Sequence, residues 1–153
     1  MNHYLISEGS LSFAEDFIDE SIHILKFPAQ AASLVITRAL LDDKQNAESY
    51  IAKQMAALKI NMPDFIAGER TVTELGCESD NIKALTAVEI PLQFTKNGTP
   101  IYQILLSTQL PNTNKLLVLT YGKTEPLSEN DKAFWQALKA SFNLAASQDN
   151  YSH

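Results

Sequence analysis

Strand-like segments far outnumber helical ones in this chain, and this imbalance limits the folds that it can adopt. The segments are rich in β-branched, aromatic and aliphatic residues, and turn signals such as Asn97-Gly98 and Pro111-Asn112 separate them. Strands joined by short connections pair antiparallel. The predicted strands cover residues 4–6, 11–13, 21–27, 33–39, 70–75, 84–95, 101–110 and 116–121.

Two segments have the apolar spacing of an amphipathic helix. The first covers residues 44–61 and must end by Met62, because Pro63 disfavours α geometry in the residue before it. The second is expected to begin at Ser128, with Asp131 as its capping-box partner. Its apolar stripe is Phe134, Trp135, Leu138 and Phe142, and Lys132, Gln136 and Lys139 are expected to face water. We therefore predict an α+β fold, with a single antiparallel β-sheet and two main helices packed on it.

The length and composition are typical of one globular domain. The chain has 153 residues, of which 45% are hydrophobic, so it can bury a core without a metal ion or a disulfide. Its single cysteine, Cys77, cannot form an intramolecular disulfide. We assign residues 1–146 to one domain and expect residues 147–153 to form a flexible polar tail.

The charge pattern argues against two classes of partner. The net charge of −6 comes without any basic run, whereas nucleic acids and anionic membrane surfaces are bound through clustered Lys and Arg. We therefore expect no nucleic-acid binding and no direct membrane binding. The first twenty residues are acidic where a signal peptide is basic, and the longest aliphatic run, Leu116–Leu119, is far shorter than the roughly 20 residues that span a bilayer. The expected location is the cytoplasm.

The residue patterns typical of catalysis are missing from the sequence. The surroundings of Cys77 are acidic, the three histidines lack metal-ligand spacing, and the isolated glycines form no phosphate-binding loop. We therefore expect no enzymatic activity, no metal and no cofactor. A weak alternative is that Glu89, the only carboxylate candidate within a strand, acts as a lone base in a sheet pocket.

Several predicted strands are apolar on both faces, although an antiparallel sheet with one wet face should alternate apolar and polar residues. Ile101–Leu106 and Leu116–Leu119 are examples, and residues 21–27 place Ile22 and Ile24 on one face and further apolar residues on the other. Two helices can cover one face and part of the second. The remainder must be covered by the partner subunit of a dimer or by an apolar ligand.

Four polar residues interrupt these apolar surfaces. In a dry core each unpaired polar group would cost about 1–3 kcal/mol. Each of them can instead hydrogen-bond to nearby backbone or reach water at a strand end. Together they are also typical of the surfaces through which transmembrane helices associate, by small residues and by Ser, Thr or Gln side chains. The four residues are Ser33, Thr37, Gln54 and Gln103.

The order and spacing of several segments resemble the DcrB-related proteins, and in particular their Eag branch, the effector-associated chaperones of bacterial type VI secretion. These segments are the pattern Tyr4-x-x-x-Glu8, residues 21–28 (Ser-Ile-His-Ile-Leu-Lys-Phe-Pro) and residues 32–38 (Ala-Ser-Leu-Val-Ile-Thr-Arg). Residues 50–54 and the pair Tyr102-Gln103 extend the similarity over nearly the whole chain. The resemblance implies a PsbP-like α+β sheet.

The resemblance further implies a homodimeric cytoplasmic chaperone. Its clients would be the N-terminal apolar helices of a secreted toxin effector, for example an Rhs-type toxin, which it would keep soluble until loading on the secretion spike protein. A one-residue shift of the last strand would turn Val118 to the other face of the sheet. Transferred by position, the client contacts would be Ile22, Ile24, Ser33, Thr37, Gln54, Gln103 and Val118.

Other functional classes remain open. The chaperone hypothesis predicts that Ile22, Ile24 and Gln103 share one open face. A carrier of an apolar ligand would need a closed pocket of roughly a few hundred Å³. An immunity protein that blocks a toxin would bind through a charged rim. An enzyme would need a buried carboxylate or histidine with a perturbed pKa.

Overall fold

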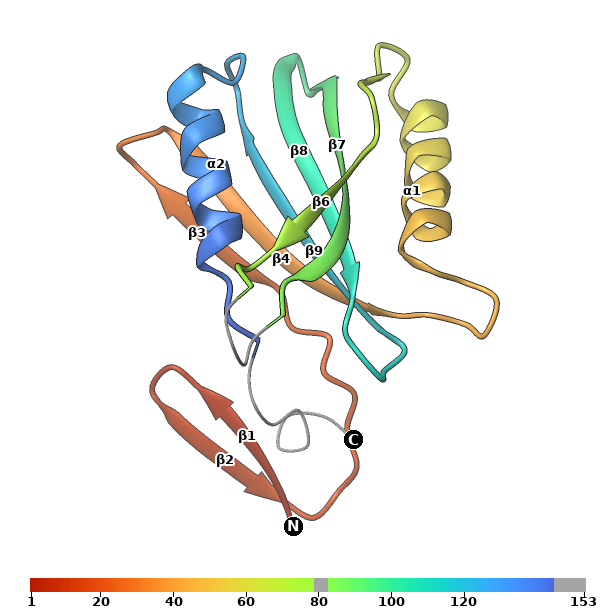
Figure 1. Cartoon of the computed structure of the whole chain (residues 1–153), viewed down its shortest axis with the longest axis vertical. Coiled ribbons are helices and arrows are strands. Elements are labelled where there is room, and N and C mark those ends of the chain that lie inside the picture. The colour runs from red at the N-terminus through yellow and green to blue at the C-terminus, as the bar shows by residue number, and fades with distance from the viewer. Residues whose placement is uncertain (79–82, 145–153) are drawn as a thin grey trace.

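The computed structural model describes residues 1–78 and 83–144. One sheet contains most of the strands in the order β3-β4-β9-β8-β7-β5, and β6 also pairs with β7 (Figure 1). All of these pairings are antiparallel, as predicted. The strands are β3 (His23–Phe27), β4 (Ala32–Leu40), β5 (Ile66–Ala67), β6 (Thr71–Leu75), β7 (Leu85–Lys96), β8 (Thr99–Gln109) and β9 (Lys115–Lys123).

The two N-terminal strands form a separate hairpin. β1 (Asn2–Ile6) and β2 (Gly9–Phe13) pair only with each other, and Figure 1 shows them away from the main sheet. The ring of Phe17 packs edge-on against Tyr4 and Phe13, with centroid distances of 5.7 and 5.0 Å. The predicted α+β class is confirmed, but the hairpin does not extend the sheet. It is joined by aromatic contacts, not by a backbone ladder, to the linker, which we define as residues 14–22 between β2 and β3.

The two helices lie on opposite faces of the sheet. Both begin with a capping box: Asn46 with Ser49 at α1 (Ala47–Asn61), and Ser128 with Asp131 at α2 (Glu129–Ser141), the second as predicted. Under α1 the core comprises Leu41, Ile51, Val88, Ile90, Leu92, Leu105, Leu116 and Val118. Under α2 it comprises Ala32, Leu34, Leu75, Leu85, Ala87, Ile104, Leu106, Leu117, Leu119, Tyr121 and Trp135.

The structure differs from the sequence prediction in further details. Helix α1 begins at Ala47 rather than at residue 44, and β3 begins at His23, so Ile22 precedes it. The short strand β5 was not predicted, because two residues carry no alternating pattern. Lys139 does not face water: the residue is only 3% exposed. Its ammonium group contacts the Glu89 carboxylate, donates to Thr73 Oγ1 at 2.9 Å and lies 5.7 Å from the centre of the Trp135 ring. A buried lysine needs such partners, and they come from strands remote in sequence.

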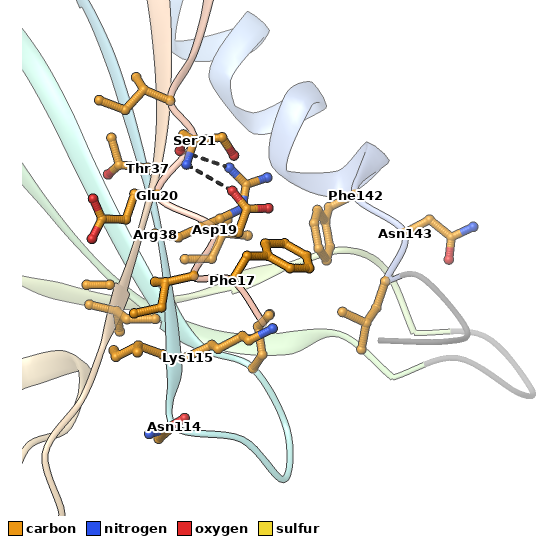
Figure 2. A pocket seen from close by; sticks show the side chains of 18 residues that line it. Phe17, Asp19, Glu20, Ser21, Thr37, Arg38, Asn114, Lys115, Phe142 and Asn143 are labelled. Atoms are coloured by element: carbon orange, nitrogen blue, oxygen red, sulfur yellow. Dashed lines mark hydrogen bonds between the residues drawn. The ribbon is translucent and has the colours of Figure 1, made fainter. Parts of the chain in front are cut away.

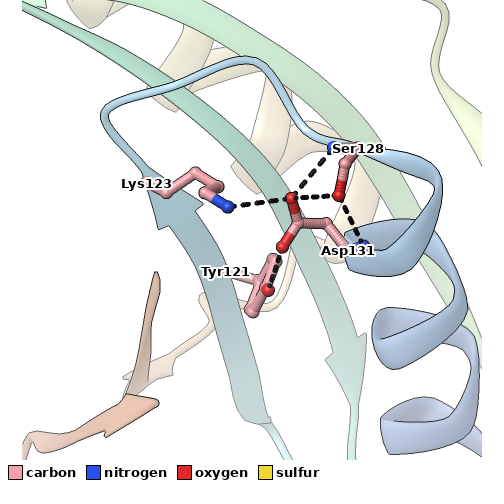
Figure 3. A network of polar contacts seen from close by, with 4 residues as sticks. All are labelled: Tyr121, Lys123, Ser128 and Asp131. Carbon is pink, nitrogen blue, oxygen red and sulfur yellow. Dashed lines mark hydrogen bonds and ion pairs between the residues drawn. The ribbon is translucent and has the colours of Figure 1, made fainter. Parts of the chain in front are cut away.

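A second polar network fixes the start of α2 on β9 (Figure 3). Asp131 accepts hydrogen bonds from the Tyr121 hydroxyl at 2.8 Å, from Lys123 at 3.1 Å and from Ser128. Burial by itself would raise the pKa of Asp131, but these hydrogen bonds lower it to about 2. Burial, followed by the bond to Asp131, raises the pKa of Tyr121. Asp131 is therefore ionised and both caps and anchors α2.

The predicted tail at residues 147–153 lies outside the described residues.

Candidate functional site

The strand register places most of the predicted contact residues on one face of the sheet. Thr37 lies opposite Val118, and Ser33 lies opposite Gly122, which also faces Gln103. Directly opposed residues in an antiparallel pair point to the same side, and positions two or four apart on a strand do as well. Val118 belongs to the core under α1, so this is the α1 side of the sheet.

Strand β3 extends the same face to the edge of the sheet. Ile24 lies opposite Val35, which is two residues from both Ser33 and Thr37. Ile24 is 61% exposed, and Ile22, two residues earlier, is 62% exposed. An apolar side chain with this much exposure on an edge strand is available to a partner. We call Ile24, Ser33, Val35, Thr37 and Gln103 the open face.

Helix α1 covers only part of its side of the sheet. Its contacts are with β7 and β8, through residues such as Ile51, Tyr50 and Met55. Gln54 lies on the same helix, half-buried, one turn from Tyr50 and Leu58. Val118 is 5% exposed, so it forms the covered floor beside the open face and offers little surface of its own. The site is therefore a half-covered face bounded by α1.

The polar groups of this site are not used internally. Ser33, Thr37, Gln54 and Gln103 are half-buried, and within the described ranges none of their side chains has a hydrogen-bond partner. Their polar atoms still reach the surface, because the only fully buried unpartnered side-chain atom in those ranges is the Ser21 hydroxyl. The structure therefore does not show the alternative, in which these side chains hydrogen-bond to nearby backbone groups. Their hydrogen-bonding groups therefore remain available to a partner on the side of the sheet that carries exposed Ile24.

A pocket of about 940 Å³ adjoins the open face. It lies where β4 ends and β9 begins, and Figure 2 shows Phe17 of the linker and Phe142 at the end of α2 bordering it, with Arg38 of β4. The Arg38 guanidinium contacts the Ser21 carbonyl at 3.5 Å and His23 Nδ1 at 3.1 Å. Ile22 and Thr37 are among its lining residues, but Leu117, Phe142 and Leu144 belong to or pack against the core under α2, so much of the pocket lies on the other side of the sheet from the open face.

The pocket was not found by sequence reasoning. Its walls come from the linker, two strand ends and the segment after α2, which no local pattern brings together. The contribution of Val35 to the open face could have been found, because it alternates with Ser33 and Thr37.

Glu89, the candidate lone base, lies on the other face of the sheet. It accepts a hydrogen bond from Trp135 Nε1 at 3.4 Å and pairs with Lys139. Its carboxylate therefore holds α2 to β7. Among the described residues no group of three or more His, Cys, Asp or Glu side chains could hold a metal ion, and Cys77 is exposed.

The described part of the chain contains no helix with the length and apolar character needed to cross a membrane.

The fold and its open face define an α+β protein whose sheet carries one helix on each side and leaves part of one side uncovered. The chain belongs to the DcrB family, whose model matches residues 8–141. No curated protein matches it.

Among solved structures, the chain is similar to PA94 from Pseudomonas aeruginosa, a protein of unknown function for which a regulatory role has been suggested. The two share 21% sequence identity and a TM-score of 0.71, over 96% of this chain and 99% of the other. This similarity supports the same fold.

Proposed function

We propose that this DcrB-family protein is a non-catalytic cytoplasmic chaperone for the N-terminal apolar helices of a type VI secretion toxin effector. It would shield these helices until the effector is loaded on the secretion spike. The observation that carries the proposal is the open face, where exposed Ile24 shares one side of the sheet with Ser33, Thr37 and Gln103, whose polar side chains have no hydrogen-bond partner among the described residues. The resemblance of residues 21–38 to the Eag branch supports the same assignment.

The chemistry of this face suits a helix that must be held and then released. Covering apolar surface contributes about 25 cal/mol per Å². The hydroxyl and amide groups can bond to polar atoms of the client, as polar side chains do between transmembrane helices. A fully apolar groove would lack these polar groups. We therefore expect the open face to bind apolar helices with moderate affinity and to accept helices of different sequence.

The proposed active form is a homodimer, so that two open faces act on one client. The excess apolar surface supports this arrangement, because Leu5, Ile6 and Leu11 of the N-terminal hairpin are about half exposed in addition to the open face.

Co-expression with the N-terminal region of a toxin encoded beside this chain tests the proposal. Size-exclusion chromatography with light scattering would measure co-elution and stoichiometry. We expect a soluble complex, with the toxin region insoluble alone. A toxin region that is soluble alone, or that does not co-elute, would contradict the chaperone function, and the catalytic part of the toxin would then test an immunity role.

The double variant Ile22→Asp/Ile24→Asp is expected to abolish co-elution without changing the thermal unfolding transition. Ile66→Asp is a matched control, because Ile66 is 58% exposed on β5, at the opposite edge of the sheet. If the double variant unfolds, those isoleucines are required for the core. If Ile66→Asp also abolishes co-elution, binding is not specific to the open face.

The pocket favours a second candidate, a carrier of an apolar ligand. Its volume of about 940 Å³ lies within the range of small-molecule sites. Native mass spectrometry of the purified protein would detect a retained ligand. Leu40→Trp, at the pocket wall and on the opposite side of β4 from Thr37, should remove the ligand while leaving co-elution with the toxin intact. A ligand-free wild-type protein would contradict this candidate.

A further inference from the structure

One position on the open side of the sheet has no side chain. Gly122 of β9 lies between Ser33 of β4 and Gln103 of β8, and is directly opposite each of them. Neighbouring strands are about 4.8 Å apart, so Ser33 and Gln103 face each other across a gap of roughly 9.6 Å. The only residue between them contributes nothing but backbone.

Position 122 favours glycine because a larger side chain would collide with its neighbours, and not because of the backbone conformation. Only Gly76 and Gly98 among the described glycines have a positive φ, so Gly122 has a backbone that any residue can adopt. A Cβ at Gly122, however, would lie 2.8 Å from Gln103 Cγ and 3.2 Å from the Tyr102 carbonyl oxygen. Contacts below 3.0 Å force one partner to move.

The side chain of Gln103 therefore lies across Gly122, in the space that a Cβ would take. Gln103 Nε2 is 3.6 Å from that Cβ position, so the amide also lies over β9, the strand between those of Gln103 and Ser33. Neither side chain has a hydrogen-bond partner among the described residues. The gap thus brings two unused polar groups toward one point of the open face.

We propose that Gly122 is a positioning residue, which seats the Gln103 amide low over β9 so that it and Ser33 can bond the same polar group of a bound apolar helix. The inference rests on the proposed chaperone function and adds a residue that touches the client only through Gln103. A side chain at position 122 would lift the amide out of this seat and fill the gap.

Two synthetic peptides test this inference. Both are Leu/Ala helices of about 20 residues with terminal lysines and a fluorescent label, and one has a single central Asn where the other has Leu. Binding is measured by fluorescence anisotropy for wild type, Gln103→Ala, Gly122→Ala and the double variant. Gly9→Ala is the matched control, since a Cβ there meets nothing within 4 Å.

We expect wild type and Gly9→Ala to prefer the Asn peptide by roughly three- to tenfold, the contribution of one hydrogen bond. Gly122→Ala should lose this preference to the same extent as Gln103→Ala, and the double variant should lose no more. Preference retained in Gly122→Ala, or equal binding of both peptides by wild type, would overturn the inference alone. Binding of neither peptide by wild type would overturn the chaperone function as well.

Thermal unfolding provides a second test that does not depend on binding. Gly122→Ala should lower the melting temperature in wild type and lower it less in the Gln103→Ala background, where the clashing Cγ is absent. Equal decreases in both backgrounds would show that Gln103 does not occupy the space over Gly122.

Discussion

Thr37 of β4 lies directly opposite Val118 of β9, and this pair marks the boundary between the covered and the open parts of one sheet face. Val118 is buried in the core under α1, whereas Thr37 is half-buried, without a hydrogen-bond partner among the described residues, and lines the adjoining pocket. The hydroxyl of Thr37 therefore reaches the surface with its hydrogen-bonding capacity unused among the described residues.

Thr37→Val is expected to weaken client binding by roughly three- to tenfold, because it removes one hydrogen bond while keeping the side-chain shape. Stability should stay the same or rise slightly. Co-elution titrations and urea unfolding measure the two quantities. Thr71→Val on exposed β6 is the control, which should leave binding unchanged. A loss of stability with unchanged binding would show that the Thr37 hydroxyl serves the fold.

Asp131→Asn is expected to lower the free energy of unfolding by about 2–4 kcal/mol, because it breaks a buried pair and leaves Lys123 uncompensated. Lys123 has a side-chain exposure of only 11%. Urea unfolding monitored by Trp135 fluorescence would measure the loss. Glu129→Gln is a control on the same helical turn, where the carboxylate is 91% exposed, and it should change stability little.

The contribution of Asp131 should also depend on pH. Its pKa is lowered from 3.8 to about 2 in the folded state, so its stabilisation is fully present above about pH 4 and decreases as the pH falls toward 2. The stability difference between wild type and Asp131→Asn should therefore be large near neutral pH and small at about pH 2. An unchanged difference across this range would mean that Asp131 does not titrate in this window.

Lys139→Met is expected to destabilise the protein by about 2–4 kcal/mol, because the partly buried Glu89 carboxylate loses its counter-ion. Adding Glu89→Gln should recover part of the loss, since the remaining group is neutral. Lys132→Met is the control, because Lys132 has an exposed side chain whose ion pair within the described residues is with the exposed Glu129. Chemical unfolding of the wild type, Lys139→Met, Glu89→Gln and the double variant would measure the coupling, and additive effects would contradict an energetic Glu89–Lys139 pair.

Local patterns predicted the elements of this fold well. The capping box at Ser128 and the alternation around Val35 depend on neighbours a few residues away, so they can be read from the chain. The same alternation places Ser33 and Thr37 on one face, whereas Ile24 joins that face through the pairing of β3 with β4. The register that brings Gln103 and Val118 to that face depends on the long β8–β9 pairing, which the structure supplies.

Long-range contacts explain what the patterns missed. Lys139 lies one turn after Trp135 on the buried face of α2. Its charge argued for water, but Glu89 and Thr73 satisfy it from strands 50 and 66 residues away. The separate N-terminal hairpin and the pocket behind Phe17 depend on how the linker packs, and Gly122 is informative only once Gln103 is known to lie over it.

Site-specific photocrosslinking tests the central claim most directly. A photoreactive phenylalanine derivative would replace Ile24, or Ile66 as the control, during co-expression with the toxin N-terminal region, and mass spectrometry would locate the crosslinked toxin residues. The account predicts crosslinks from position 24 to the apolar helices of the toxin and none from position 66. Crosslinks from position 66 alone, or a stable complex without crosslinks from position 24, would contradict client binding at the open face.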